Sequence, residues 1–132
     1  MKISEVSKKV GLSVATIRYY TDLGMIPSLK RDDEDQRIFN DESVVWLQGI
    51  KFLRDLDIPL AEIKEYLELS QHTGPAALKK RHQMLLQQRE RAQIKVQQSE
   101  AYLTRLDQKV QLEEEIIKGK KKDSLSPARR FY

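Results

Sequence analysis

The stretch LSVATIRYYTDLGMIP, residues 12–27, decides the fold that we expect for this protein. Ser13 is a favourable N-cap, because its side-chain oxygen can accept a hydrogen bond from a backbone N–H in the first turn of a helix. The helix that it opens runs through Tyr20 toward Gly24. A shorter apolar pattern precedes this stretch at residues 3–10, and Gly11 is suited to end it. Two short helices with such a tight connection predict a helix-turn-helix motif.

The second of these helices has an outward face of unusual chemistry. Val14 and Ile17 can face the first helix, just as Ile3, Val6 and Val10 can face the second. The outward face then holds Ala15, Thr16, Arg18 and Tyr19. A guanidinium, a phenol and a small hydroxyl suit phosphate oxygens and base edges in a DNA major groove. They also suit a solvated surface helix, so this helix alone leaves both interpretations open.

The neighbouring segments favour the DNA interpretation. Residues 29–39 are short, alternate like a strand at residues 37–39, and are bent by four acidic residues at 32–35. They predict a small hairpin, which would form a wing beside the helix-turn-helix. Asn40 or Asp41 then caps a helix with apolar residues at helical spacing, namely Val44, Leu47, Ile50, Leu53 and Leu56. Residues 57–59 break it, and a fourth helix ends near Ser70.

A sustained 3-4 repeat of seam positions runs from Leu78 to Ile117. So narrow an apolar strip on a helix of about 60 Å cannot be buried by the helix alone, which predicts a coiled coil with a second chain. A helix folded back onto its own domain is the alternative, but no other segment is long enough to cover it. The expected dimerisation residues are Leu85, Ala92, Val96, Leu103, Leu106 and Val110.

The predicted organisation is therefore mainly α-helical. Residues 1–70 form a winged helix-turn-helix DNA-binding domain, residues 71–77 a linker, residues 78–117 a coiled-coil dimerisation helix, and residues 118–132 a basic, disordered tail. The 132 residues, 39% hydrophobic and 33% charged, suit one small domain with an extended element. No apolar run reaches the roughly 18 residues of a membrane span, so we expect a soluble cytoplasmic protein without membrane contact.

The net charge of +4 is unevenly distributed. Residues 1–31 carry six basic and two acidic side chains, whereas residues 32–70 carry four basic and eleven acidic ones. Residues 118–132 carry six basic and one acidic. The basic face within residues 1–31 is therefore the sharper electrostatic indication of a nucleic-acid partner.

Three segments carry a family resemblance: KISEVSKKVGLSVATIRYYTDLGMIP (residues 2–27), RIF (residues 37–39) and LQGIKFLRDLDIPLAEIKEYL (residues 47–67). Together they resemble the DNA-binding domain of the MerR family of transcription regulators, and the similarity extends through the long helix. The resemblance implies a homodimer held by an antiparallel coiled coil and bound to double-stranded promoter DNA. It further implies that the dimer acts by distorting the promoter spacer, with RNA polymerase at the same promoter.

The resemblance also implies which residues contact DNA. The recognition helix and the wing would supply Thr16, Arg18, Tyr19, Tyr20, Lys30, Arg31 and Arg37. Tyr20 would support packing or reach the DNA backbone, and Arg37 would meet a phosphate. The family's wing usually has a Gly-Tyr or Gly-x pair before this arginine, where this chain has Asp35 and Gln36. Because the acidic residues 32–35 repel phosphate, we expect the wing tip to point away from DNA or the affinity to be modest.

Within the family, one subgroup has similar residues at the positions of Trp46, Ile50-Lys51, Ile58-Pro59, Glu65-Tyr66 and Leu69. By these residues the chain most resembles the regulators that respond to aldehydes and nitrosative stress. Their sensor is a cysteine, but this position is Phe52 here, and the chain has no cysteine at all. A phenyl ring cannot be alkylated or oxidised as a thiolate can. We interpret Phe52 as core packing, with room left by Gly49, and keep Phe52 and Trp46 as a possible effector region. Three accounts of how the protein is regulated remain open: a bound ligand, a partner protein, or no effector at all.

Other functional classes find little support in the sequence. His72 and His82 lack further ligands at metal spacing, so we expect neither a metal nor a cofactor. No phosphate loop, nucleophile motif or paired carboxylates indicate an enzyme with catalytic residues. The alternative function is a coiled-coil interaction protein whose winged domain binds a protein partner. The eleven acidic side chains within residues 32–70 favour this alternative, whereas Arg18 and Tyr19 on the surface of the second helix oppose it.

Overall fold

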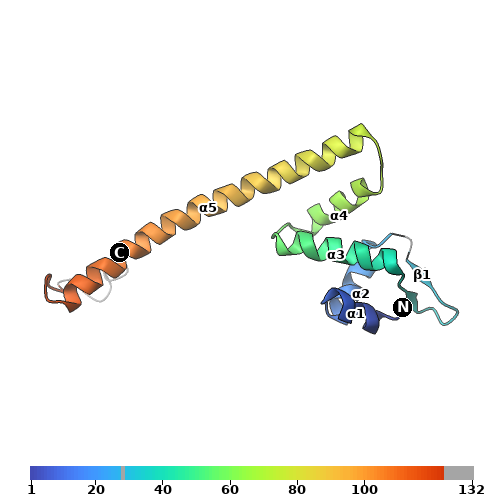
Figure 1. Ribbon diagram of the computed structural model, residues 1–132, viewed down its shortest axis with the longest axis horizontal. Coiled ribbons are helices and arrows are strands. Elements are labelled where there is room, and N and C mark those ends of the chain that lie inside the picture. Colours follow the sequence, from blue (N-terminus) through green and yellow to red (C-terminus); the bar gives the residue numbers. More distant parts are fainter. Residues whose placement is uncertain (28, 124–132) are drawn as a thin grey trace. The chain divides into compact units, whose positions relative to one another are not determined.

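The computed structural model describes residues 1–27 and 29–123. Within these described residues, five helices and a two-stranded sheet follow one another in the order α1, α2, β1, β2, α3, α4, α5 (Figure 1). The chain divides into two compact units, Met1–Leu85 and the part from Leu86 onward. The mainly helical, winged helix-turn-helix fold predicted from the sequence is confirmed.

The first two helices form the helix-turn-helix. Helix α1 (Ile3–Val10) ends at Gly11, whose φ of 71° lies in the left-handed region that glycine favours. Helix α2 (Val14–Asp22) begins after Ser13, whose Oγ accepts a hydrogen bond from the Thr16 backbone N–H at 3.1 Å. Both ends were predicted from the sequence, because a glycine stop and a serine cap are local signals.

The wing is a minimal hairpin. Strand β1 (Lys30–Arg31) pairs antiparallel with β2 (Arg37–Ile38), so that Lys30 lies opposite Ile38 and Arg31 opposite Arg37. The Phe39 backbone N–H donates to the carbonyl of Met1 at 3.1 Å. The start of the chain therefore lies against the base of the wing.

Two further helices complete the core of the first unit. Helix α3 (Asp41–Asp55) opens with a capping box formed by Asn40 and Ser43, and α4 (Leu60–Ser70) follows the break at Pro59. Helix α1 packs on α2 and α3, and α3 packs on α4. The side chains that are almost fully buried come from α1 to α4 and from the connection between β2 and α3, and the largest are Phe39, Ile17, Leu47, Ile50, Ile63 and Val6.

Helix α5 (Pro75–Ile117) is longer than predicted. It begins at Pro75, so the connection after α4 is shorter than the expected linker of residues 71–77. Arg81 fixes the start of α5 against the end of α4. Its Nη1 donates hydrogen bonds to the carbonyl oxygens of Leu69 at 2.9 Å and His72 at 3.1 Å. The first compact unit accordingly includes the start of α5 as far as Leu85.

The predicted basic tail, residues 118–132, is described only as far as Asp123. In that part the Lys118 backbone N–H still donates to the Glu114 carbonyl at 3.0 Å, and Lys121 forms an ion pair with Glu115 at 2.9 Å. The prediction of disorder for the remaining nine residues falls outside the described part of the chain. Among the residues that are described, no helix has the length and apolar character needed to cross a membrane.

Candidate nucleic-acid interface

Helix α2 presents the outward face that its sequence predicts. Ile17 is fully buried, whereas Arg18 is exposed and Tyr19 is 54% exposed. Thr16 is half-buried, and its Oγ1 accepts a hydrogen bond from the Ser13 Oγ at 2.8 Å. Within residues 1–27 and 29–123, no group hydrogen-bonds to the Arg18 guanidinium, so its five donors face solvent. An exposed helix face with such a side chain is suited to base edges.

Tyr20 differs from its neighbour. Its side chain is only 6% exposed and belongs to the hydrophobic core, while its ring lies 6.1 Å from that of Tyr19. Of the two roles considered for Tyr20, this position fits packing beneath the recognition face rather than contact with DNA.

A hollow of about 350 Å³ lies between the helix-turn-helix and the wing. Its lining combines the chain start, α2 and the hairpin, and consists of Lys2, Ile3, Arg18, Arg31, Asp35, Gln36 and Arg37. We call it the basic groove, because four of these side chains are cationic and one is a carboxylate. Three predicted DNA-binding residues, Arg18, Arg31 and Arg37, are thus brought together, whereas Lys30 is exposed on β1 outside the groove.

Apart from Arg18, the cations of the groove have carboxylate or carbonyl partners within the protein. Arg37 forms an ion pair with Asp22, the last residue of α2. The Arg31 Nη1 donates to the Asp35 carbonyl at 2.9 Å and lies 3.5 Å from the Asp35 Oδ1. Without DNA, the positive charge of the groove is therefore partly neutralised by the chain itself.

Asp32 organises the wing turn. Its Oδ1 accepts hydrogen bonds from the backbone N–H groups of Gln36 at 2.9 Å and Glu34 at 3.0 Å, and its Oδ2 lies 3.4 Å from the Lys2 Nζ. These interactions, led by the Gln36 backbone N–H, hold the pKa of Asp32 below its usual value. At least one member of the acidic run at residues 32–35 thus has a structural role.

Asp35 stands where the family's wing usually has glycine, and its backbone explains that preference. Its φ of 61° lies in the left-handed region. Aspartate tolerates this conformation better than most residues other than glycine. The turn therefore keeps its shape with a carboxylate added beside the groove.

The interpretation of Phe52 as core packing is wrong for this chain. Phe52 is 63% exposed, because it lies about 200° around the helix from Ile50, which is fully buried. Val45 and Leu56 are exposed too, at 64% and 56%, so the predicted apolar face of α3 does not extend to Leu56. A Cβ at Gly49 would meet nothing within 4 Å, so that glycine is not needed to make room for the ring.

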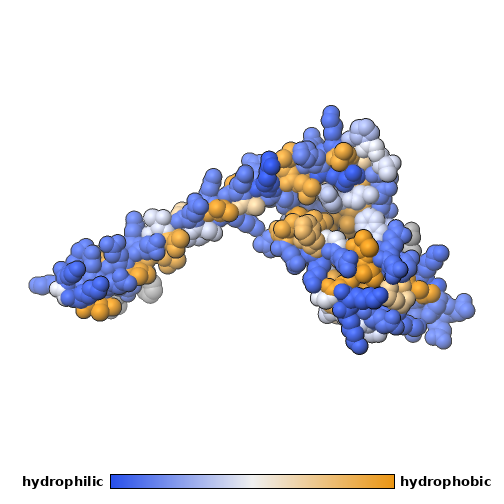
Figure 2. Space-filling view, in the orientation of Figure 1, coloured by the Kyte–Doolittle hydropathy of each residue, from blue (hydrophilic) through white to orange (hydrophobic). Residues whose placement is uncertain are grey.

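The exposed side chains of Val45, Phe52 and Leu56 give α3 an apolar surface. Hydrophobic residues are visible over α3 and α4 in Figure 2. Trp46, the other residue of the possible effector region, is half-buried and packs against the core.

The predicted dimerisation residues on α5 are all exposed in the single chain. Leu103, Leu106 and Val110 are 58%, 61% and 51% exposed, and Val96 is 56% exposed. Leu85 is 39% exposed, and Ala92 is exposed as well. Figure 2 shows separate hydrophobic patches along α5 among hydrophilic side chains.

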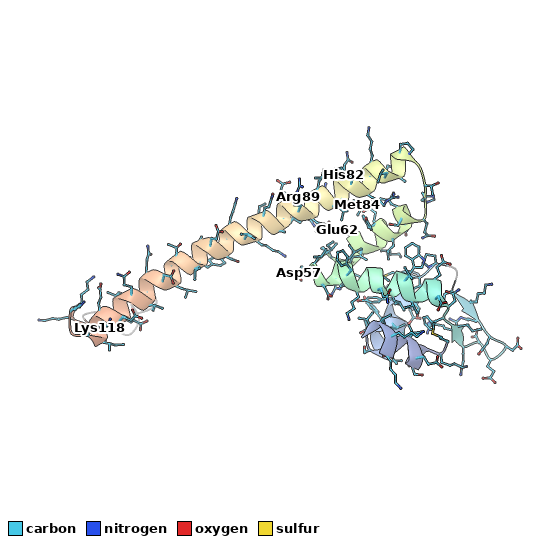
Figure 3. The ribbon with its side chains drawn as sticks, in the orientation of Figure 1. Asp57, Glu62, His82, Met84, Arg89 and Lys118 are labelled. Atoms are coloured by element: carbon cyan, nitrogen blue, oxygen red, sulfur yellow. The ribbon has the colours of Figure 1, made fainter. Side chains whose placement is uncertain are left out.

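No metal centre is found among the described residues, since they contain no group of three or more potential His, Asp or Glu ligands. Figure 3 labels His82 on α5, where its near neighbours in the sequence are Lys79, Lys80 and Arg81. Cations on the same turns disfavour a metal ion there.

Three contributors to this region were missed by the sequence analysis. Lys2 lines the groove and donates from Nζ to the Gln36 Oε1 at 2.8 Å, Asp22 pairs with Arg37, and Lys51 ties α3 to α1. Their partners lie 34, 15 and 41 residues away in sequence. Local patterns carry no signal for such pairs.

Two family models match the chain. The model described as "MerR HTH family regulatory protein" matches residues 1–70, and the one described as "MerR, DNA binding" matches residues 44–109. The HTH-type transcriptional regulator AdhR of Bacillus subtilis is 34% identical over 91 residues, which cover 69% of this chain. The same match spans 64% of that regulator, which is less than two thirds of its own length.

Solved structures agree with this assignment. A putative MerR family transcriptional regulator from Listeria monocytogenes is 31% identical with a TM-score of 0.68, and the match covers 83% of each chain. HiNmlR, a MerR family regulator lacking the sensor domain and bound to promoter DNA, shares the fold with a TM-score of 0.66 at 23% identity, over 88% of this chain and 87% of its own. These relatives are regulators rather than enzymes, as the sequence predicts. The chain belongs to the MerR family of helix-turn-helix regulatory proteins.

Proposed function

We propose that this protein is a transcription regulator that binds promoter DNA sequence-specifically as a homodimer. The observation that carries the proposal is the position of the exposed Arg18 and Tyr19 on α2 beside the basic groove of a MerR family chain. Base-reading donors and phosphate-binding cations on adjacent surfaces are what a DNA-binding domain requires. The alternative, a winged domain that binds a protein partner, is not favoured by the family assignment.

In this proposal α2 enters the major groove. Arg18 can donate two parallel hydrogen bonds to a guanine, and Thr16 and Tyr19 contact neighbouring bases or phosphates. Arg31 and Arg37 from the groove, and Lys30 from the outer part of β1, bind the DNA backbone and fix the orientation of α2. Tyr20 contributes indirectly, since its buried ring supports the helix that carries these groups.

We propose that α5 forms the dimer as an antiparallel coiled coil. The exposed seam residues support self-association, and the charges along α5 support the antiparallel orientation. Residues 75–98 carry six basic and one acidic side chain, whereas residues 99–117 carry two basic and five acidic ones. In a parallel pair like charges would lie opposite each other, whereas an antiparallel pair places the basic half of each helix against the acidic half of its partner.

The dimer would act on the promoter by distorting the spacer between its recognition elements, with RNA polymerase bound to the same promoter. We place the protein in the cytoplasm, with the DNA that it regulates. The similarity to the aldehyde- and nitrosative-stress-responsive subgroup remains part of this proposal, but its thiol chemistry does not, because Phe52 replaces the sensor cysteine and the chain has no other.

A binding competition tests the function. The purified protein is titrated onto duplex DNA from upstream of its own gene, in the presence of an excess of unrelated duplex of equal length. The proposal predicts a retained complex of one dimer per site, unaffected by a thiol-alkylating reagent. Equal competition by both duplexes would contradict sequence-specific binding. Loss of the complex after alkylation would contradict the absence of thiol sensing.

A further inference from the structure

The ion pair between Arg37 and Asp22 lies at the edge of the basic groove. Arg37 is the wing arginine, and its side chain is only 22% exposed, whereas that of Asp22 is 61% exposed. The carboxylate is thus the more solvent-exposed member of the pair.

The position of Asp22 in its helix supports a functional role for its ion pair with Arg37. Asp22 is the last residue of α2, and the C-terminus of a helix carries a partial negative charge. An aspartate there is electrostatically unfavourable for the helix itself. Its favourable interaction is with Arg37, across 15 residues of sequence.

A carboxylate and a DNA phosphate bind an arginine in the same way. Both accept charge-assisted hydrogen bonds from the planar guanidinium, often two at once. Asp22 therefore occupies the Nη2 donor of Arg37, which a phosphate could otherwise use. Asp35 has a similar relation to Arg31, whereas no described group binds the guanidinium of Arg18.

We propose that Asp22 masks Arg37, and that a backbone phosphate of DNA takes the place of the Asp22 carboxylate when the basic groove binds DNA. This inference rests on the proposed function and adds a role for Asp22 in setting the affinity of the basic groove for DNA. Every duplex must displace the carboxylate, whether or not it also offers base contacts to Arg18. The mask therefore lowers the affinity for promoter and unrelated DNA by about the same factor and leaves the ratio of the two affinities unchanged.

The test compares Asp22→Asn with Asp55→Asn in the full-length protein. Asp55 is also exposed and is also the last residue of a helix, α3, but it does not line the groove. Both variants remove one negative charge, so their difference isolates the mask. We measure the dissociation constants for the promoter duplex and for an unrelated duplex at about 0.1 M salt.

We expect Asp22→Asn to tighten binding to the unrelated duplex by about fivefold or more relative to Asp55→Asn, which is the effect of one unit charge about 4 Å from a phosphate in water. The affinity for the promoter duplex should rise by about the same factor, so the ratio of the two dissociation constants should not change. An affinity within about twofold of that of Asp55→Asn, or a weaker one, would overturn the proposal, and a weaker one would make Asp22 an orienting partner of Arg37 instead.

A double-mutant cycle separates masking from a general change in charge. In the Arg37→Gln background, Asp22→Asn should have no more effect than Asp55→Asn, because no arginine remains to be masked. If Asp22→Asn increased the affinity for DNA in this background as much as it does when Arg37 is present, the proposal would be overturned. If the wild-type protein does not prefer its promoter duplex, the proposed function fails. If it does and Asp22→Asn has no specific effect, only this inference fails.

Discussion

The Nζ of Lys51 on α3 donates a hydrogen bond to the backbone carbonyl of Val10, the last residue of α1, at 3.0 Å. The bond gives an otherwise unpaired helix carbonyl a positively charged donor at the helix end that favours cations. It also joins α3 to the helix-turn-helix beside Gly11, where an added Cβ would lie 2.8 Å from the same Nζ. Lys51 therefore stabilises the position of α1 relative to the core.

Lys51→Met should lower the free energy of unfolding by about 1–2 kcal/mol, because it removes a partly buried hydrogen bond with a charged donor. Chemical denaturation measures this change. Lys64→Met is the matched control, since Lys64 is an exposed lysine on α4, and should change stability by less than about 0.5 kcal/mol. Equal losses in the two variants would show that the bond to Val10 contributes nothing.

Arg18→Ala should weaken binding to the promoter duplex by about 1–3 kcal/mol, because it removes a bidentate base contact. Fluorescence anisotropy gives the affinity, and sedimentation should show an unchanged dimer. Lys64→Ala removes a positive charge outside the proposed interface and serves as the control. Full affinity of the Arg18 variant would exclude this residue from the site.

Replacing Leu103 and Leu106 together by glutamate should give monomers and abolish tight DNA binding, because one half-site contact cannot replace two. Analytical ultracentrifugation reports the mass. The control places glutamate at Gln97 and Gln108, which are exposed positions off the seam of the same helix. A double leucine variant that remains dimeric would place the interface elsewhere on the chain.

Asp32 should titrate below 3.8, the ordinary value for an aspartate, because the Gln36 backbone N–H and further donors stabilise its charged form and lower its pKa. Since the pKa is lower in the folded chain, its contribution to wing stability is complete above the unfolded pKa and is lost as the pH falls through the folded one. An NMR titration of the side-chain carboxyl measures this. A pKa at or above the ordinary value would contradict the hydrogen bonds in the turn.

Phe52→Ala should lower the free energy of unfolding by less than about 1 kcal/mol, because the ring is 63% exposed and leaves no cavity. Phe39→Ala, which removes a ring that is 1% exposed, should cost about 3–5 kcal/mol. Thermal and chemical unfolding compare the two. A large loss for Phe52 would show that another surface covers it in the assembled protein.

Much of the fold could be predicted because its signals are local. The serine cap of α2, the glycine after α1 and the asparagine cap of α3 each depend on residues within one helical turn, and the apolar spacing of each helix defines its buried side. The outward face of α2 followed from the same spacing. Arg18 and Tyr19 could therefore be placed on the surface from sequence alone.

The remaining contacts of the site could not be predicted from the sequence, because they depend on the tertiary structure. Lys2, Asp22 and Lys51 find their partners across long stretches of chain, so nothing in their own neighbourhood identifies them. The prediction that Phe52 packs in the core is wrong because its position around α3 points away from the buried Ile50. Large apolar side chains are common on protein surfaces, so the position of a residue in its helix, and not its type, decides whether it is buried.

The salt dependence of promoter binding tests the central claim most directly. If Lys30, Arg31 and Arg37 replace counterions on the DNA backbone, log K should fall linearly with log salt concentration, with a slope of roughly −0.9 for each phosphate contacted. A dimer with these contacts in both domains should give a slope of about −4 to −6. A salt-independent affinity, or no binding of the promoter duplex at any salt concentration, would contradict the account.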